Sequence, residues 1–150
     1  MRLVIQRVSE SSVKVEGKLV SEIKKGLLIL VGVENEDTES DIEWLAAKTA
    51  NMRIFNDSAG VMNLSIQDVG GEILTISQFT LTASTKKGNR PSYIRAARPE
   101  TAEPIYHKYC DLLSKMIGNE VKKGIFGADM KVSLINDGPV TIIIDSKLRE

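Results

Sequence analysis

Hydrophobic and polar residues alternate along the first part of the chain with the period of two that is typical of strands. The segment 2–9 alternates in this way, and 13–15 and 19–23 do so on either side of a short turn at 16–18, which predicts a hairpin. The apolar run 27–33 is continuous, which predicts a strand buried on both faces.

Two later segments carry apolar residues at helical spacing. Thr38 is a suitable N-cap with Asp41 three residues on, and the apolar face that follows consists of Ile42, Leu45, Ala46 and Thr49. A second helix is predicted over 100–117, ended by Gly118 in a left-handed cap, with an apolar stripe of Ile105, Tyr109, Leu112, Leu113 and Met116.

The remaining segments predict further strands and loops. Residues 56–71 are polar and glycine-rich, 72–82 favours a strand, and 83–98 favours an extended loop. The last strands are predicted at 121–126, 131–136 and 140–145. About seven strands and two main helices indicate a single α+β domain over 1–150, with mostly antiparallel or mixed sheets forming a barrel-like core.

Composition narrows the chemistry. Hydrophobic residues make up 42% and charged residues 27%, no apolar run approaches the roughly 18 residues that span a bilayer, and the N-terminus lacks a signal-peptide core. We therefore expect a cytoplasmic protein without a membrane partner. The chain has one cysteine, Cys110, and one histidine, His107. These numbers exclude an internal disulfide, a zinc site made of cysteines and a multi-histidine metal site within one chain. No metal or cofactor is expected, and both residues are predicted to be structural or surface residues.

The net charge is zero, but its distribution is uneven. The segment 86–98 contains no acidic residue and five basic ones, Lys86, Lys87, Arg90, Arg95 and Arg98. Such a stretch is either a solvated loop or a patch that attracts phosphate.

Two polar motifs end or separate apolar strands. Ser77-Gln78-Phe79-Thr80 is either a polar strand end, with Gln78 and Thr80 on one face, or a strip whose amides and hydroxyls bind a ligand. Asn136-Asp137-Gly138-Pro139-Val140-Thr141 is either an ordinary turn or, if its Gly-Pro bond is cis, a rigid pair of carbonyl acceptors.

Together these motifs resemble the two signatures of the D-aminoacyl-tRNA deacylase family (the D-tyrosyl-tRNA(Tyr) deacylase type). Arg7-Val8 near the start also fits, so the resemblance covers the whole chain, and Ser84-Thr85 is a departure where an acidic residue often follows Ala83. Further matching segments are Met62-Asn63-Leu64-Ser65, Asp68-Val69-Gly70-Gly71-Glu72, Lys87-Gly88-Asn89-Arg90-Pro91-Ser92 and Gly124-Ile125-Phe126-Gly127-Ala128-Asp129-Met130.

The resemblance implies a homodimer with active sites at the subunit interface. It implies hydrolysis of the ester between a D-amino acid, or achiral glycine, and the 3′-terminal adenosine of tRNA, with L-aminoacyl-tRNA rejected by a Gly-cisPro motif. The catalytic pocket is then expected at Ser77, Gln78, Phe79 and Thr80, and chiral selection at Gly138 and Pro139. Arg7 resembles the residue that supports this motif across the interface, together with Asn136, Val140 and Thr141.

Several alternatives stay open. Backbone amides of Phe79 and Thr80 could bind the oxyanion while water attacks, helped by the 2′-hydroxyl of the ribose, or Thr80 could be a covalent nucleophile, although no base is evident for it. The basic residues are predicted to contact tRNA phosphates. Rival functions are a non-enzymatic nucleic-acid-binding module and a hydrolase of small D-amino acid esters.

Overall fold

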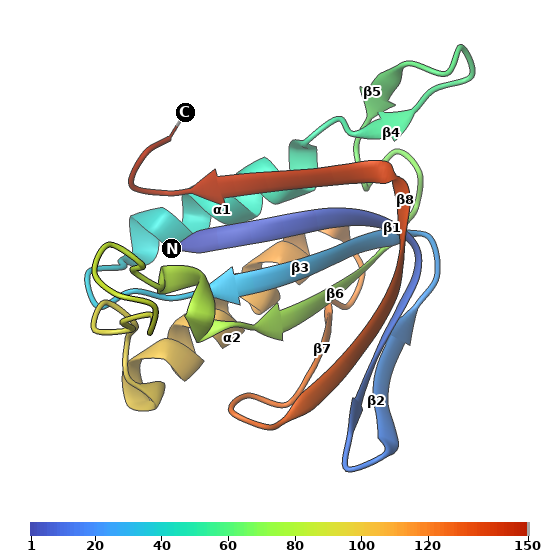
Figure 1. Cartoon of the computed structure of the whole chain (residues 1–150). Coiled ribbons are helices and arrows are strands. Elements are labelled where there is room, and N and C mark those ends of the chain that lie inside the picture. Colours follow the sequence, from blue (N-terminus) through green and yellow to red (C-terminus); the bar gives the residue numbers. More distant parts are fainter. Residues whose placement is uncertain (150) are drawn as a thin grey trace.

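The long strand β1 (Arg2–Val15) organises the sheet, because it pairs with three other strands (Figure 1). This computed structural model describes residues 1–149. The first half of β1 pairs antiparallel with β3 (Gly26–Gly32), and its second half pairs antiparallel with β2 (Lys18–Ile23). The strand β8 (Met130–Asp145) pairs antiparallel with β1 along its other edge. The predicted hairpin and the buried strand are confirmed.

The other side of the sheet is parallel. β6 (Glu72–Ser77) pairs with β3, and the short β7 (Lys122–Lys123) pairs with β6. The Ser21 hydroxyl donates to the Lys123 carbonyl at 2.7 Å, and the Lys122 ammonium donates to the Glu22 carbonyl at 2.9 Å, so β2 and β7 nearly close the sheet into a barrel. A separate hairpin joins β4 (Phe55–Asn56) and β5 (Met62–Leu64). The prediction of an α+β fold with a barrel-like mixed sheet is confirmed.

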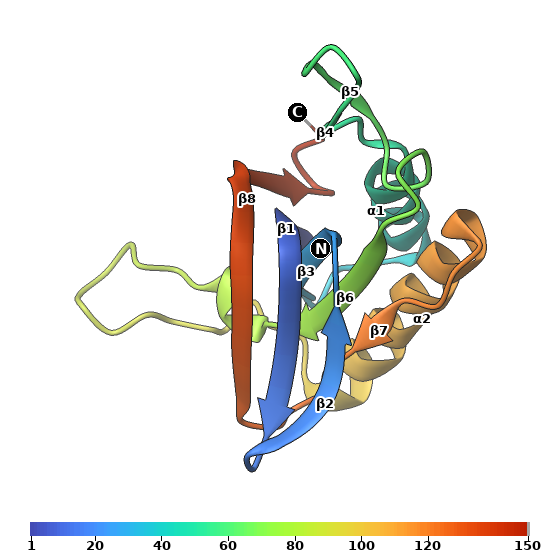
Figure 2. The same ribbon diagram turned by 90° about the vertical axis from the view of Figure 1, so that its right-hand side faces the viewer.

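Both long helices, α1 (Glu39–Asn51) and α2 (Pro99–Ile117), lie on one face of the sheet, as Figure 2 shows. α1 follows Thr38 as predicted, and all four residues of its predicted face are buried. The hydroxyls of Thr49 and Tyr109 join the two helices at 2.9 Å. Gly118 ends α2 with φ of 67°, also as predicted. No helix among residues 1–149 has the length and apolar character needed to cross a membrane.

Apolar side chains on the two faces of the sheet form two clusters. The larger cluster fills the space between sheet and helices and includes Leu3, Ile5, Ile29, Leu45 and Leu113. The smaller cluster lies inside the curved half of the sheet and consists of Val8, Val13, Ile23, Leu28, Leu74 and Ile76. Burial on both faces explains the unbroken apolar run of β3.

The predicted strand 72–82 is wrong in its second half. β6 ends at Ser77, and Phe79–Thr82 form a 3₁₀ turn, η1, so Gln78 and Thr80 do not share a strand face. The neighbouring strand β3 ends at Gly32 and offers its last acceptor, the Val31 carbonyl, to the Gln78 amide at 2.7 Å. Beyond that point the chain satisfies its own backbone groups with local hydrogen bonds.

The interpretation of the segment around Gly138-Pro139 as an ordinary turn is also wrong. β8 is one strand that bends sharply (Figure 1), and its pairing advances from Thr141 to Asn136 while β1 advances only from Gln6 to Val8. The extra residues bulge out of the ladder, because Pro139 has no amide to donate. The bond between Gly138 and Pro139 is cis.

Two smaller predictions are corrected. The strand predicted at 121–126 is reduced to Lys122–Lys123, because it pairs only with two residues of β6 before Gly124. In α2, Met116 is exposed and the buried stripe is Ala102, Tyr106, Tyr109, Cys110 and Leu113. Small residues at 102 and 110 let the helix approach the sheet, so the two tyrosines face the core.

Gly32 seats the η1 turn directly on the end of β3. A Cβ at this position would lie 2.9 Å from the Leu81 Cβ and 3.2 Å from the Gln78 carbonyl oxygen. Gly32 is thus required by close approach and not by its own backbone conformation.

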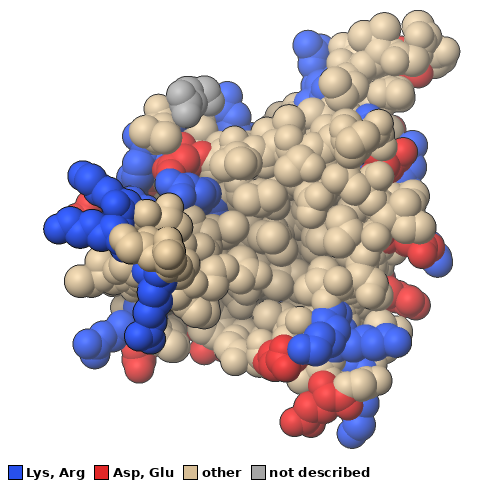
Figure 3. All heavy atoms as spheres, in the orientation of Figure 1, with Lys and Arg blue, Asp and Glu red and all other residues tan. Residues whose placement is uncertain are grey.

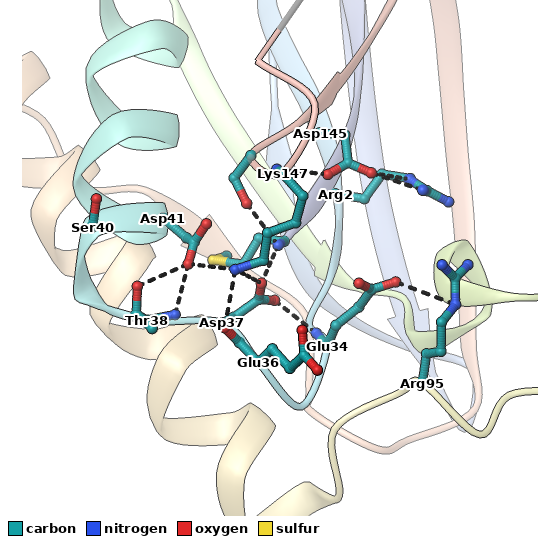
Figure 4. Close-up of polar contacts among 12 residues, drawn as sticks. Arg2, Glu34, Glu36, Asp37, Thr38, Ser40, Asp41, Arg95, Asp145 and Lys147 are labelled. Atoms are coloured by element: carbon teal, nitrogen blue, oxygen red, sulfur yellow. Dashed lines mark hydrogen bonds and ion pairs between the residues drawn. The ribbon is translucent and has the colours of Figure 1, made fainter.

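A charged cluster joins the C-terminal segment to the start of α1 (Figure 4). The buried Asp41 carboxylate accepts hydrogen bonds from the Thr38 amide at 2.8 Å, from the Thr38 hydroxyl at 2.9 Å, and from the Lys147 ammonium at 2.9 Å. Burial by itself would raise the pKa of Asp41, but the bonds from Lys147 and Thr38 outweigh it and hold that pKa well below its ordinary 3.8.

Replacing Gly32 with alanine should displace η1. We expect Gly32→Ala to lose about 1–3 kcal/mol of unfolding free energy through overpacking and to shift the amide NMR resonances of residues 78–82. Gly17→Ala is the control, because Gly17 has φ of 77° and no neighbour within 4 Å; it should lose about 1 kcal/mol without moving those resonances. Unchanged resonances in Gly32→Ala would contradict the close approach.

Asp41 should make the fold acid-sensitive. A depressed carboxyl pKa stabilises the folded state above the unfolded value, near pH 4, and this contribution is lost as pH falls toward the folded pKa. In urea titrations, Asp41→Asn should lose about 2 kcal/mol at pH 7, and the gap to wild type should narrow below pH 4. The exposed Asp111→Asn serves as control. A gap that is independent of pH would refute the assignment.

Candidate functional site

The η1 turn presents two unpaired amides at the end of β6. In the described residues, the Phe79 and Thr80 amides donate to no acceptor, because they occupy the first positions of a helical turn. The Leu81 amide donates to the Gln78 carbonyl and the Ala83 amide to the Thr80 carbonyl. Two adjacent free donors can bind one oxygen that carries negative charge.

The side chains of the same motif provide hydroxyls but no base. The Gln78 side-chain amide donates to the Thr80 hydroxyl, and among the described residues no carboxylate or imidazole bonds that hydroxyl or the hydroxyl of Ser77. His107 lies exposed on α2 beside Glu103. Cys110 is buried beside the Thr75 hydroxyl, and burial raises the pKa of its thiol to about 11. His107 is thus at the surface and Cys110 is part of the core, and neither is placed to assist chemistry at the motif.

A cavity of about 540 Å³ opens beside the first three residues of the motif. Its wall includes Ser77, Gln78 and Phe79, and much of the rest is apolar, contributed by β3, α2 and the segment 126–130. Sequence reasoning missed Tyr106 and Phe126, whose rings lie 6.0 Å apart at this wall. Two sequence features could have indicated them: the small and aromatic residues at helical spacing in α2, and the glycines that flank Phe126 before β8.

The second motif is held by its own chain at the bend of β8. The Arg7 guanidinium is buried and donates to the Asp137 carbonyl at 3.0 Å and to the Ile54 carbonyl at 2.7 Å. A Cβ at Gly138 would lie 2.7 Å from the Arg7 guanidinium, and its φ is 126°, so this position requires glycine.

Asn136, Thr141 and Val140 surround this bend as a hydrogen-bonded group. The Asn136 amide donates to the Gln6 side-chain oxygen at 2.9 Å and to the Thr141 hydroxyl at 3.2 Å. The Val140 amide donates to the Asn136 side-chain oxygen at 3.4 Å. Three of the four sequence-predicted supporting residues, Asn136, Val140 and Thr141, are thus hydrogen-bonded as one group, while the fourth, Arg7, contacts Asp137.

The two motifs lie far apart within one chain. β8 and β6 are separated by β1 and β3. Leu3 on β1 pairs with Val31 on β3, and Val31 pairs with Ser77 on β6. Arg7, which contacts the second motif, lies four residues further along β1. Three strand spacings of about 4.8 Å and four residues of about 3.3 Å place the motifs roughly 20 Å apart. Neither Gly138 nor Pro139 lines the cavity beside η1.

The basic residues Lys86, Lys87 and Arg90 lie on an arm between Ser84 and Ser92 that projects from the sheet face opposite the helices (Figure 2), whereas Arg95 and Arg98 follow the arm and Arg98 is the N-cap of α2. Ser84 and Ser92 pair at its base, and Lys86, Lys87, Arg90 and Arg98 are exposed. Arg95 differs from them, because it donates to the Thr82 carbonyl at 3.2 Å and lies 3.7 Å from the Glu34 carboxylate. In Figure 3, blue side chains gather over this arm, while the centre of the sheet face is free of charge.

The described residues contain no group of three or more His, Cys, Asp or Glu side chains arranged to hold a metal ion. The site as described brings together the backbone amides of Phe79 and Thr80, the hydroxyls of Ser77 and Thr80, and a neighbouring apolar cavity.

Comparison with known proteins identifies the family of this chain. The family model described as D-Tyr-tRNA(Tyr) deacylase matches residues 4–145. The chain is 61% identical to a D-aminoacyl-tRNA deacylase of Flavobacterium psychrophilum and 60% identical to one of Porphyromonas gingivalis, each over the full length of both chains. A solved structure named c-Myc DNA Unwinding Element Binding Protein is 40% identical, with a TM-score of 0.92 over 97% of this chain and 98% of that one. This chain belongs to the D-Tyr-tRNA(Tyr) deacylase family.

Proposed function

We propose that this protein hydrolyses the ester between a D-amino acid and the 3′-terminal adenosine of tRNA, and so proofreads aminoacyl-tRNA in the cytoplasm. The observation that carries the proposal is the pair of free amides of Phe79 and Thr80 beside an apolar cavity. Relatives that are about 60% identical over the full chain bear the name D-aminoacyl-tRNA deacylase. The cavity, with the Phe126 ring in its wall, is large enough for the adenine of the terminal nucleotide.

The reaction needs little beyond positioning, because an aminoacyl ester is already labile. Water adds to the ester carbonyl carbon, and the amides of Phe79 and Thr80 bind the oxygen that becomes negative. The bond from carbon to the ribose oxygen then breaks, and that oxygen takes up the proton that the water has lost, with help from the neighbouring 2′-hydroxyl. One such donor contributes roughly 3–4 kcal/mol of transition-state stabilisation. The lack of a base beside Thr80 favours this route over a covalent threonine.

We propose further that the working enzyme is a homodimer. Two motifs roughly 20 Å apart can form one pocket only if the second comes from another copy of the chain. The sheet face opposite the helices supports such an interface: Val4, Leu30 and Ile143 are paired neighbours on it, and Ile143 is 68% exposed. Figure 3 shows this face to be without charged side chains at its centre.

In this dimer, the carbonyl oxygens of Gly138 and Pro139 face the substrate Cα from the partner side. They leave room for a hydrogen where an L substituent would point, while a D side chain points away from them. Because only the position of an L side chain is blocked, the enzyme would select the D configuration without selecting a particular side chain. Glycine carries two hydrogens and is therefore accepted.

The exposed basic residues of the arm are proposed to contact tRNA phosphates. Lys86, Lys87 and Arg90 lie on the arm and the exposed Arg98 lies at the start of α2, where they would position the acceptor stem without reading its sequence.

Two rival functions remain distinguishable. A non-enzymatic nucleic-acid-binding module has support in the name of the 40% identical solved structure, which describes binding to a DNA element. That function gives no purpose to free amides beside a cavity. A hydrolase of small D-amino acid esters would act without the tRNA arm. Intact tRNA binding without turnover would favour the first, and equal activity on a short ester would favour the second.

Handedness is the direct test of the proposed function. With D-tyrosyl-, L-tyrosyl- and glycyl-tRNA assayed side by side, we expect hydrolysis of the D-aminoacyl and glycyl esters and release of the L-amino acid at the uncatalysed rate. The measurement is the release of labelled amino acid against an enzyme-free control. Comparable hydrolysis of the D and L forms would refute selection by exclusion.

The Thr80 hydroxyl should be dispensable. Thr80→Ala leaves both amides in place, so we expect turnover within about tenfold of wild type, which corresponds to 1.4 kcal/mol. Thr80→Ser, which keeps the hydroxyl, is the matched variant. Loss of all turnover in Thr80→Ala, together with an acyl-enzyme trapped on the wild type, would establish the covalent mechanism instead.

Charge reversal on the arm should weaken tRNA binding and its salt dependence. In the triple variant Lys86→Glu/Lys87→Glu/Arg90→Glu, we expect Kd to rise. The slope of log Kd against log salt should fall by an amount that corresponds to the loss of at least about two phosphate contacts. Reversal at Lys14, Lys18 and Lys115, which are exposed elsewhere, controls for net charge. Equal slopes in all three proteins would remove the arm from the binding surface.

A further inference from the structure

Two arginines from distant parts of the chain donate to neighbouring carbonyls at the end of η1. Arg2 donates to the Leu81 carbonyl at 2.8 Å, and Arg95 donates to the Thr82 carbonyl at 3.2 Å. Carbonyls at the end of a helical turn lack partners within the turn and favour cationic donors. The free amides of Phe79 and Thr80 lie at the beginning of the same four-residue turn.

Each arginine is oriented by a carboxylate. The Nε and Nη2 atoms of Arg2 donate to one oxygen of Asp145 at 3.0 and 2.7 Å (Figure 4). This leaves the Nη1 atom free to donate to the Leu81 carbonyl. Burial alone would raise the pKa of Asp145, but the hydrogen bonds from the Lys147 amide and the Arg2 guanidinium outweigh it and lower that pKa below its ordinary value. The carboxylate is therefore charged at neutral pH. The Arg95 Nε atom lies 3.7 Å from a Glu34 oxygen that has no hydrogen-bond partner in the described residues.

The backbone fixes the positions from which these arginines act. Arg2 pairs with Asp145 on β8 and with Gly32 on β3, so it stands where the turn is seated. The Asn35 amide donates to the Arg95 carbonyl at 3.2 Å, which ties the segment after the arm to the loop after β3. The turn is thus held at its start by Val31 and at its end by two side chains.

We propose that Arg2 and Arg95 are positioning residues for the deacylase reaction, which fix the Phe79 and Thr80 amides by holding the Leu81 and Thr82 carbonyls. This inference rests on the proposed function. Arg95 accordingly serves the turn and not the tRNA phosphates, in contrast to Lys86, Lys87 and Arg90. The turn η1 has only four residues and rises about 2 Å per residue, so its two ends lie close together. A displacement of its last carbonyls therefore also displaces the amides at its beginning.

The two arginines should differ in effect. Arg2 is 28% exposed and makes three hydrogen bonds, whereas Arg95 is 50% exposed and makes one longer bond to the turn. A shift of about 1 Å in a group that contacts the reacting atoms can cost on the order of 100-fold in rate. We therefore expect kcat to fall by about 10- to 100-fold in Arg2→Met and by about threefold in Arg95→Met.

The experiment measures kcat and KM on D-tyrosyl-tRNA together with the amide resonances of Phe79 and Thr80. In Arg2→Met, kcat should fall while KM stays within about twofold, because the arm and the cavity are untouched. Arg2→Lys should recover part of kcat, since an ammonium can reach Leu81 but not hold both partners. Lys115→Met, which removes an exposed charge on α2, should change neither quantity.

The outcomes separate this inference from the function on which it rests. If kcat of Arg2→Met matches wild type, or if the Phe79 and Thr80 resonances stay in place, the positioning role is overturned while the deacylase function stands. A lower melting temperature with unchanged kcat also overturns it. If wild type does not hydrolyse D-tyrosyl-tRNA but the two resonances move in Arg2→Met, Arg2 still positions the turn and the proposed function fails.

Discussion

The parallel pairing of β3 with β6, and its end at Gly32, is the constraint on which the site depends. As long as β3 continues, β6 is an ordinary buried strand whose amides and carbonyls are used by the ladder. After Val31 accepts the Gln78 amide, the next residues have no partner strand and close into η1. The free amides of Phe79 and Thr80 are a direct consequence of where the neighbouring strand ends.

The second constraint is the pairing of β1 with β8. The two strands pair over almost their whole lengths, so the segment around Gly138-Pro139 is forced out as a bulge between two ladders. Arg7 fills the space beneath it and ties it to the Ile54 carbonyl. Rigid sheet geometry therefore fixes both motifs, and it also keeps them apart, which is why we propose that a second copy of the chain completes the pocket.

Much of the fold could be predicted from the sequence, because local patterns decide it. Alternation identified the hairpin of β1 and β2, and Thr38 and Gly118 gave the helix limits. The two failures at the motifs have a common cause. Whether Phe79–Thr82 continue a strand, and whether Asn136–Thr141 turn, depends on partners distant in sequence, namely the end of β3 and the length of β1. The sequence motifs predicted candidate site residues, whereas Tyr106, Phe126 and Arg2 join the candidate site only through tertiary packing.

The claim that two chains complete one active site has a direct test in mixed dimers. Phe79→Pro removes one amide donor, and Gly138→Ala places a Cβ against Arg7; each variant should be inactive alone on D-tyrosyl-tRNA. Unfolded, mixed and refolded together, they should regain about a quarter of wild-type turnover, because random pairing makes half the dimers mixed and each mixed dimer holds one intact composite site. No recovery in purified mixed dimers would contradict a site shared between subunits.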